Sequence, residues 1–349
     1  MDNVQPPGWL LAEAGLEVLP GDIRPREGRA WLAARGGTRM VLRQQPAPGP
    51  GGLTDDVSWL HAFLTRLAGL GFPAPRPVPC FAGRSWTMAR GALWEVVSFL
   101  PGRVVGWAAE PSMEEIGALL ARYHTTARQI EVTSQRPAAL PLAEVPQILL
   151  SGQLEAVHLD ADVMVVIRRE AERLARDLDQ TGHLVPERVV IHGDFTNHNV
   201  VADGTPPRAT GVIDFAGAHA ERPLADIGYG LWRSGRPRQD ADDLDLARIV
   251  RFLRGYATVL PVSADEARSI PVYIRGRGLQ MIAKRVRAGR AETGMLAQVQ
   301  WLRAHGAALG NALAAAHRLT PVVAAVSGNR GWRRRQLRPG AGAGRRRPG

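Results

Sequence analysis

The residues from Val189 to Phe215 constrain the fold of this chain more than any other stretch. Two apolar runs, Val189–Ile191 and Val200–Ala202, flank a polar loop. A turn at Asp203–Pro206 then leads into a third apolar run, which ends at Asp214. Short β-rich runs separated by turn residues predict the order strand, loop, strand, turn, strand.

Three side chains with oxygen atoms should meet at one end of this small hairpin. They are Asp194 and Asn199 in the loop and Asp214 after the last strand. Phosphoryl transfer needs a carboxylate that orients a hydroxyl and accepts its proton, and it needs hard oxygen ligands for Mg²⁺. Asp194 fits the first role, and Asn199 and Asp214 fit the second. The stretch therefore predicts a phosphotransferase site that uses Mg²⁺.

The spacing of this motif points to a known family. His192–Asn199 reads His-x-Asp-x-x-x-x-Asn, which is the spacing of the kinase catalytic loop. His-Gly-Asp replaces His-Arg-Asp, and Ile213-Asp214-Phe215 follows closely. With these residues the chain resembles the aminoglycoside phosphotransferase family of the protein-kinase-like superfamily. The resemblance implies a two-lobed α+β fold with a small antiparallel β N-lobe and a mainly helical C-lobe, and ATP with Mg²⁺ bound between the lobes.

Length and composition fit such a protein. A chain of 349 residues favours two lobes or domains over one. No run approaches the roughly 18–20 apolar residues of a membrane span, and the first residues do not have the pattern of a secretory signal. The single cysteine, Cys80, excludes an intrachain disulfide framework and fits the reducing cytoplasm. We therefore expect a cytoplasmic protein without a membrane span.

The net charge of +11 is concentrated near the C-terminus. Residues 327–349 contain eight arginines and no acidic residue, so the other 326 residues carry a net charge of only +3. This tail has the composition of a disordered segment. It could attract nucleic acid weakly, but it lacks a groove-binding motif, so we expect no specific nucleic-acid partner.

A pair of strands, Arg29–Arg35 and Thr38–Gln44, should form a hairpin through Gly36-Gly37. By resemblance to kinases, the polar turn before it would cover the nucleotide phosphates. The strand Met40–Arg43 resembles the kinase strand that carries the phosphate-binding lysine, and Arg43 occupies the lysine position. Arg43 is therefore the predicted cation for the α- and β-phosphates.

The helix predicted over Thr54–Leu70 should pack on these strands with one apolar face. Kinases carry on this helix a glutamate that pairs with the phosphate-binding lysine. This segment has no glutamate. Either Asp55 or Asp56 therefore takes that place beside Arg43, or the ion pair is absent.

The strand Leu93–Phe99 leads into Leu100-Pro101-Gly102, which resembles the hinge between kinase lobes. The resemblance implies that backbone groups of Ser98 and Leu100 bind the adenine edge. We therefore predict an N-lobe over residues 1–100, a C-lobe over 101–326 and a disordered tail over 327–349. Helices are expected at Ser112–Gln129, Ala161–Asp179, Leu246–Leu260, Ala264–Arg290 and Ala297–Leu319.

Two further residues support the catalytic loop by resemblance alone. Asp226 matches the acidic residue that braces this loop through backbone hydrogen bonds, and His192 packs beneath it. His124 is expected to be structural. Glu221-Arg222 stands where the family usually has Gly-Asp, which leaves contacts to the acceptor open.

The acceptor cannot be named from the sequence. An antibiotic or secondary metabolite of aminoglycoside-like type fits the resemblance best. The Gly71–Pro77 link and the hinge also resemble type II homoserine kinases, which makes a metabolite kinase the alternative. A non-catalytic nucleotide-binding protein is the lower alternative. Four aspartates over residues 240–245 could hold a cationic acceptor, but a solvated loop and helix start explain them more simply.

Overall fold

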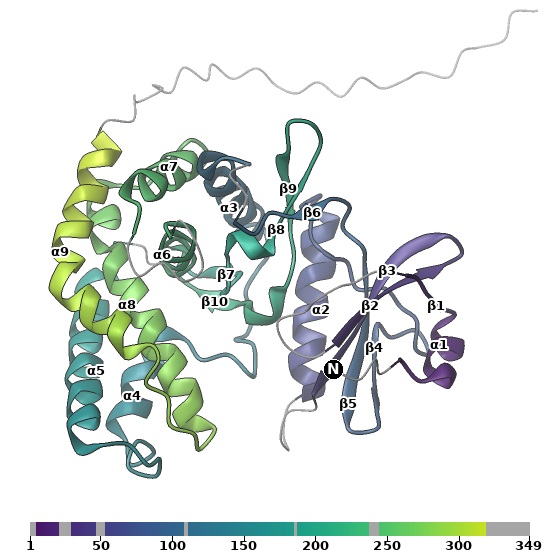
Figure 1. Cartoon of the computed structure of the whole chain (residues 1–349), viewed down its shortest axis with the longest axis horizontal. Coiled ribbons are helices and arrows are strands. Elements are labelled where there is room, and N and C mark those ends of the chain that lie inside the picture. The colour runs from purple at the N-terminus through teal and green to yellow at the C-terminus, as the bar shows by residue number, and fades with distance from the viewer. Residues whose placement is uncertain are drawn as a thin grey trace, which may run out of the picture. The chain divides into compact units, whose positions relative to one another are not determined.

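The computed structural model describes residues 5–20, 29–46, 53–107, 111–184, 187–236 and 244–318. Within these residues, a five-stranded antiparallel sheet with its two flanking helices is followed by a mainly helical part (Figure 1). The predicted α+β architecture is therefore confirmed. The predicted lobe boundary at residue 100 stays a prediction. The polar turn before the first hairpin and the arginine-rich tail lie outside the described residues.

The sheet has the strand order β1-β2-β3-β5-β4, and every neighbouring pair is antiparallel. The predicted Gly-Gly hairpin is the turn between β2 and β3, with both glycines at positive φ. The strands are β1 (Glu17–Val18), β2 (Arg29–Arg35), β3 (Thr38–Pro46), β4 (Trp86–Ala89) and β5 (Ala92–Ser98), and the flanking helices are α1 (Gly8–Ala14) and α2 (Leu53–Gly69).

Strand β5 lies between β3 and β4, and residues on both of its faces are buried. Side chains alternate between the faces of a strand. Trp94 and Val96 pack into a cluster with Leu10 of α1. Glu95 points the other way and contacts His61 of α2. A charged side chain is thus buried between the sheet and α2.

The helical part confirms the five helices predicted there, with ends that differ by at most three residues. Ser112 and Ser263 cap the helices that follow them, as serine before an apolar periodic run predicts. Helix α6 and the short helix α4 were not predicted. The helices are α3 (Met113–Ala127), α4 (Val145–Leu150), α5 (Ala161–Thr181), α6 (Pro223–Ser234), α7 (Leu246–Ala257), α8 (Ala264–Arg287) and α9 (Leu296–Arg318).

The strands around the central motif form two small sheets, not one. Strand β7 (Val189–Ile191) pairs with β10 (His219–Glu221), whereas β8 (Val200–Asp203) and β9 (Arg208–Val212) form the predicted hairpin. Strand β6 (Arg103–Val104) extends that hairpin. Strand β7 therefore does not pair with the β8–β9 hairpin, although it directly precedes the loop that leads into β8. Asn199 precedes β8 and Asp214 follows β9, so both lie at the same end.

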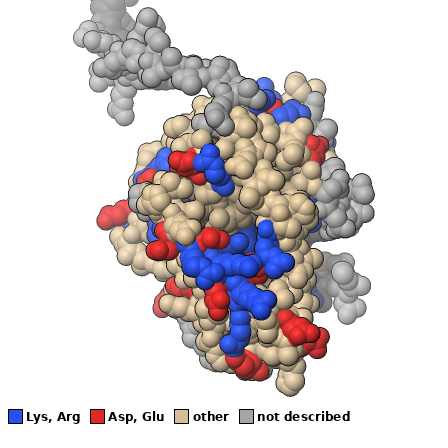
Figure 2. Space-filling view, turned by 90° about the vertical axis from the view of Figure 1, so that its left-hand side faces the viewer, with Lys and Arg blue, Asp and Glu red and all other residues tan. Residues whose placement is uncertain are grey.

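The face formed by α5, α8 and α9 carries a band of basic side chains with acidic ones around it (Figure 2). Between α5 and α8, Arg275 forms ion pairs with Asp177 and Glu170, and Arg173 pairs with Glu170 as well. These arginines are compensated by carboxylates within the fold. Within the described residues, no helix is both long and apolar enough to cross a membrane.

Candidate active site

The loop between β7 and β8 is held by Asp226, a fully buried residue in the first turn of α6. Its carboxylate accepts hydrogen bonds from the backbone N–H groups of His192, at 2.6 Å, and Gly193, at 2.8 Å. His124 of α3 contacts the same carboxylate at 3.2 Å. Burial acts to raise the pKa of Asp226, but these partners outweigh it and the pKa is lowered. A charged Asp226 therefore fixes the backbone directly before Asp194.

The same loop is pressed against the segment after Asp214. Gly193 has φ +74°, and a Cβ at this position would lie 2.1 Å from the carbonyl oxygen of Gly217, so only glycine fits. The backbone N–H of Asp194 lies 3.2 Å from Nδ1 of His192, whose Nε2 is 2.9 Å from the Ile213 carbonyl. His192 thus connects the residues before Asp214 with Asp194.

The structure brings Asp194 and Asn199 together. The Asn199 side-chain amide donates to the Asp194 carbonyl at 2.9 Å and lies 3.4 Å from its carboxylate. The Asn199 carbonyl accepts from the Ile213 N–H at 2.8 Å, which places the loop beside the residue before Asp214. Asp194 is half-buried in a loop whose other residues are nearly all buried. Its carboxylate is therefore presented at the surface of an otherwise packed loop.

Asp214 has an unusual backbone conformation. Its φ of 61° and ψ of 64° lie in the left-handed region, which non-glycine residues rarely adopt. Strained residues of this kind cluster at functional sites, where the surrounding structure holds them. The Asp214 carboxylate accepts from Nη2 of Arg43 at 3.2 Å. The predicted phosphate-binding cation and the predicted metal ligand are thus in direct contact.

Arg43 has a partner that the sequence did not predict. Glu95 lies directly opposite Arg43 across β3 and β5, and its carboxylate is 3.5 Å from Nη1 of Arg43. Burial acts to lower the pKa of Arg43, but the charges of Glu95 and Asp214 outweigh it and the pKa is raised. Neither Asp55 nor Asp56 pairs with Arg43, so that alternative was wrong, and the ion pair with an acid of this helix is absent, as the other alternative held. A carboxylate on the neighbouring strand pairs with Arg43 instead.

Glu95 is stabilised as an anion by a small network. Its side chain is 2% exposed. It accepts from Gln45 at 2.6 Å and contacts Nε2 of His61 at 2.8 Å. Burial acts to raise the pKa of Glu95, yet Arg43, His61 and Gln45 together lower it to about 2. Helix α2 therefore contributes a histidine to this cluster and not an acid.

Asp56 forms an ion pair with a different arginine. It forms a two-pronged pair with Arg136, at 2.8 and 2.6 Å, and both residues are largely buried. Arg136 also donates to the carbonyls of Ala216 and Ala218, at 2.6 and 3.2 Å. Helix α2 is thereby connected to the segment that follows Asp214.

The predicted hinge residues lie at the end of β5, but one predicted contact meets an obstacle. The backbone N–H of Ser98 donates to the Arg76 carbonyl at 2.8 Å. That N–H is therefore already used, which leaves the carbonyl of Ser98 and the backbone of Leu100 as candidates for an adenine contact. The Leu100 side chain packs on β9, where a Cβ at Gly211 would lie 2.5 Å from it. The roles of Ser98 and Leu100 stay predictions.

The aspartates of residues 240–243 lie outside the described residues. Asp245 caps α7, accepting from the N–H groups of Ala247 and Arg248, which agrees with the simpler explanation of that acid. Glu221 accepts from the N–H groups of Leu142 and Arg222. It therefore supports the backbone beside the site.

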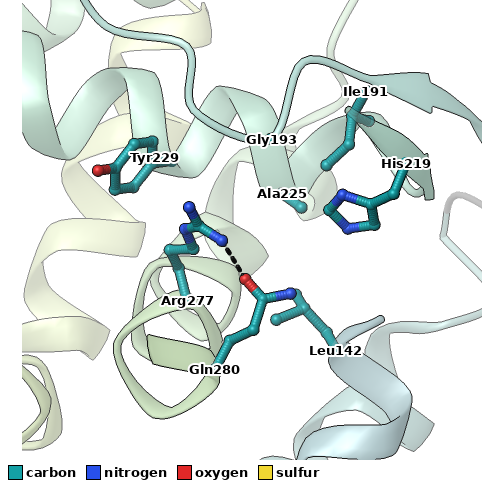
Figure 3. A pocket seen from close by; sticks show the side chains of 8 residues that line it. All are labelled: Leu142, Ile191, Gly193, His219, Ala225, Tyr229, Arg277 and Gln280. Atoms are coloured by element: carbon teal, nitrogen blue, oxygen red, sulfur yellow. Dashed lines mark hydrogen bonds between the residues drawn. The ribbon is translucent and has the colours of Figure 1, made fainter. Parts of the chain in front are cut away.

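A small cavity beside the catalytic loop was not predicted from the sequence (Figure 3). Arg277 and Gln280 of α8 point into it and form a hydrogen bond with each other. His219 of β10 faces them from the opposite side. The cavity is lined by Leu142, Ile191, Gly193, His219, Ala225, Tyr229, Arg277 and Gln280.

Comparison with known proteins identifies the family. Residues 17–262 match the model of the phosphotransferase enzyme family, which is well over half of the chain. The chain belongs to this family. The match includes every predicted site residue, and the predicted class, a small-molecule phosphotransferase with a kinase-like fold, is confirmed.

Individual relatives are more distant. A homoserine kinase of Methylobacillus glycogenes is 28% identical over 228 residues, which cover 64% of this chain and 66% of that protein. The chain thus matches about two thirds of that relative's length. An amicoumacin kinase solved with AMP-PNP and Ca²⁺ has a TM-score of 0.61 at 18% identity, covering 84% of this chain and 88% of the other.

A second solved structure resembles the chain over a similar length. The aminoglycoside phosphotransferase of Streptomyces rimosus, solved with ADP and streptomycin, has a TM-score of 0.51 at 17% identity. The alignment covers 77% of this chain and 95% of the other. At such identities the two solved structures show a shared fold.

Proposed function

We propose that the chain transfers the γ-phosphate of ATP to a hydroxyl group of a small molecule. The observation that supports this most is the meeting of Asp194, Asn199 and Asp214 at one end of the β8–β9 hairpin. Asp194 orients the acceptor hydroxyl and accepts its proton. Because phosphoryl transfer asks little covalent chemistry of the protein, positioning and charge neutralisation supply most of the rate.

The residues present fit a Mg²⁺ ion. The Asn199 amide nitrogen donates to Asp194, so its oxygen remains as a ligand, and Asp214 adds a carboxylate. Two hard oxygen ligands are what Mg²⁺ commonly takes from a protein, with water and phosphate oxygens completing its shell. Among the described residues no group of three acidic, histidine or cysteine side chains forms a complete metal site, which agrees with a metal shared with phosphates. The ion would neutralise charge on those phosphates.

Arg43 would bind the α- and β-phosphates, and Glu95 would position it. An arginine that is already held by a buried carboxylate loses little freedom when it binds a second anion. In the structure Arg43 contacts Asp214, and the arriving phosphates would take over part of that contact. The adenine would lie at the end of β5 next to Leu100. We also propose that the activity is cytoplasmic, because ATP is the proposed phosphate donor and the single cysteine fits a reducing compartment.

The acceptor belongs to one of two predicted classes. The solved relative from S. rimosus binds streptomycin, which agrees with an aminoglycoside-like acceptor. Several curated relatives at 25–29% identity are homoserine kinases, which favours a small amino acid as the second candidate. Both classes offer a hydroxyl to the same catalytic residues.

The proposal is tested by incubating the full chain with Mg²⁺, γ-labelled ATP and a panel of aminoglycosides, homoserine and amino sugars. We expect label to pass to at least one acceptor, and we expect chelation of the metal to stop it. Asp214→Asn should lose most of this transfer, whereas the exposed hairpin residue Asp203→Asn serves as the matched control. Nucleotide binding without transfer to any acceptor would instead favour a non-catalytic nucleotide-binding protein.

A further inference from the structure

Helix α8 presents a row of polar side chains to the catalytic loop. Arg277, Gln280 and Lys284 are spaced three and four residues apart, so they lie on one face of the helix. Arg277 and Gln280 line the cavity beside Gly193, the residue before Asp194. The positive charge of Lys284 interacts favourably with Asp194 itself. This face of α8 therefore borders the place where an acceptor hydroxyl would lie.

The charge of Arg277 is not balanced by a nearby acid. Its guanidinium donates to the neutral side chain of Gln280 and lies 4.9 Å from the centre of the Tyr229 ring. Its Nε is buried without a hydrogen-bond partner, and no described carboxylate lies within ion-pair distance. Arg275 on the same helix, by contrast, pairs with Asp177 and Glu170. Arg277 is thus a cation held beside a cavity by neutral groups.

Lys284 adds a second positive charge. It is the only lysine of the chain. Burial, together with the charges of Arg277, Arg136 and Arg287, lowers its pKa to about 8, although Asp194 acts in the opposite direction. Lys284 is therefore mostly protonated near pH 7 and lies in a region with an excess of positive charge.

His219, like Arg277, lines the cavity and has one buried nitrogen without a hydrogen-bond partner. His219 is 4% exposed, and its Nδ1 is 2.8 Å from the Gly217 carbonyl. Its Nε2 is buried without a hydrogen-bond partner, and the ring points into the cavity (Figure 3). Buried polar atoms without partners are rare in folded proteins and call for an explanation. A ligand with polar atoms in this cavity would satisfy both His219 and Arg277.

No acid near this cavity forms an ion pair with Arg277 or Lys284 among the described residues. Glu221 accepts from the backbone N–H groups of Leu142 and Arg222, and its charge acts on His219, whereas Asp56 pairs with Arg136. Asp194 is the third acid near the cavity, and its role in the proposed reaction is to hold the acceptor hydroxyl. A polycationic acceptor would therefore bring like charges next to Arg277 and Lys284, which costs binding free energy.

We propose that the acceptor carries a carboxylate that binds to Arg277 and Lys284, at the end of the molecule opposite the hydroxyl held by Asp194. The guanidinium fork suits a planar carboxylate, and charge-assisted hydrogen bonds of this type are the strong ones. His219 and Gln280 bind the remaining polar atoms of the acceptor. This inference rests on the proposed phosphotransfer and narrows its acceptor to small hydroxy acids and hydroxyl-bearing amino acids.

The test compares each acid with its neutral amide. The full chain is assayed with Mg²⁺ and ATP on L-homoserine, L-serine and 4-hydroxybutyrate, and on the primary amides of all three. We expect kcat/KM for at least one acid to exceed that for its amide by roughly 10- to 100-fold, the range of a hydrogen bond to a charged group. Arg277→Gln should reduce this ratio toward one, and Arg277→Lys should restore part of it.

The matched control is Arg285→Gln, which removes the same charge from an exposed position on the same helix. It should leave the acid-to-amide ratio unchanged. Lys284→Gln is the second test variant if Arg277→Gln does not fold, and it should lower the ratio as well. An equal rate for acid and amide, or a ratio that neither variant alters, would overturn this inference and leave phosphotransfer standing. No transfer to any acid, amide or aminoglycoside would overturn the proposed function itself.

Discussion

The two ends of the candidate site are built in different ways. At the catalytic end, Asp194, Asn199 and Asp214 lie within 21 residues of sequence, and Asp226 follows closely behind. At the cation end, Glu95 of β5 contacts both Arg43 of β3 and His61 of α2, so the cluster draws on two strands and a helix. The first end is defined by local spacing, and the second by which side chains the tertiary fold brings together.

This difference decides how each end tolerates change. The loop before Asp194 depends on one buried carboxylate that satisfies two backbone N–H groups, so it has no substitute if that carboxylate is lost. The carboxylate beside Arg43 is held by three side chains, Arg43, His61 and Gln45, any of which can change alone. We therefore expect a single substitution to reduce stability or activity strongly at the catalytic end and by a smaller amount at the cation end.

The largest effect on stability is expected for Asp226→Asn. The amide can accept only through one oxygen and cannot balance His124, so a buried N–H group and a buried charge network lose their partner. Removing one member of such a buried network costs about 3–5 kcal/mol of unfolding free energy. Urea unfolding measures this, with exposed Asp203→Asn as the control, which should change stability by less than about 0.5 kcal/mol. Equal stability of the two variants would refute the bracing role of Asp226.

The next largest effect concerns the pH dependence of stability. The pKa of Glu95 is about 2 in the folded chain, below its ordinary value of 4.5. A lowered folded-state pKa gives stability that is complete above about pH 4.5 and is lost as the pH falls toward 2. The difference corresponds to about 3 kcal/mol at neutral pH.

This second prediction is checked with Glu95→Gln. Unfolding free energies of the variant and the wild type should converge as the pH falls from 5 to 3, because the wild type alone loses the Glu95 contribution. Two curves that stay parallel over this range would show that Glu95 is not held as an anion by Arg43 and His61.

A smaller effect is expected for Arg43→Gln on the use of ATP. Losing charge-assisted contacts with phosphates should lower kcat/KM for ATP by roughly 10- to 100-fold. Arg43→Lys should recover only part, because an ammonium cannot contact Glu95 and the phosphates with the geometry of a guanidinium fork. Arg66→Gln, which removes the same charge from an exposed position on α2, is the control and should have little effect. An unchanged KM for ATP in Arg43→Gln would remove Arg43 from the site.

The smallest effect is expected at the outer edge of the cation end. Ser85 contacts Nδ1 of His61 at 2.7 Å and thereby orients the ring that holds Glu95. Ser85→Ala should lower the unfolding free energy by about 1 kcal/mol, the usual value of one hydrogen bond. Thermal unfolding measures it. A loss as large as that of Asp226→Asn would mean that the two ends do not differ in the way described.

The same contrast explains what could be predicted from the sequence. Asp194, Asn199 and Asp214 were predicted to meet because a hairpin fixes which residues lie at its end. Glu95 was missed because no local pattern says which strand will lie beside Arg43. One signal was present: Glu95 is the only charge in the apolar run Ala92–Ser98, and a buried charge requires a partner.

The acceptor side was beyond prediction for a related reason. Arg277 lies more than 80 residues after Asp194. The sequence predicts the buried face of its helix, but it does not predict which segment of the chain packs against that face. The pairing of β7 with β10 and the helix α6 were also missed, because three-residue strands and a helix that begins with proline give weak periodic signals. These elements position the acceptor cavity, so its charge became visible only in the folded structure.

The Asp194→Asn variant tests whether Asp194 orients the acceptor hydroxyl and accepts its proton at a kinase-like centre. The measurement is kcat for the accepted substrate, with ATP affinity determined in parallel and Asp203→Asn as the matched control. We expect kcat to fall roughly 10²- to 10⁴-fold, the usual contribution of a proton-accepting group, while ATP binding persists. An Asp194→Asn variant that turns over at a rate near that of the wild type would contradict this role of Asp194.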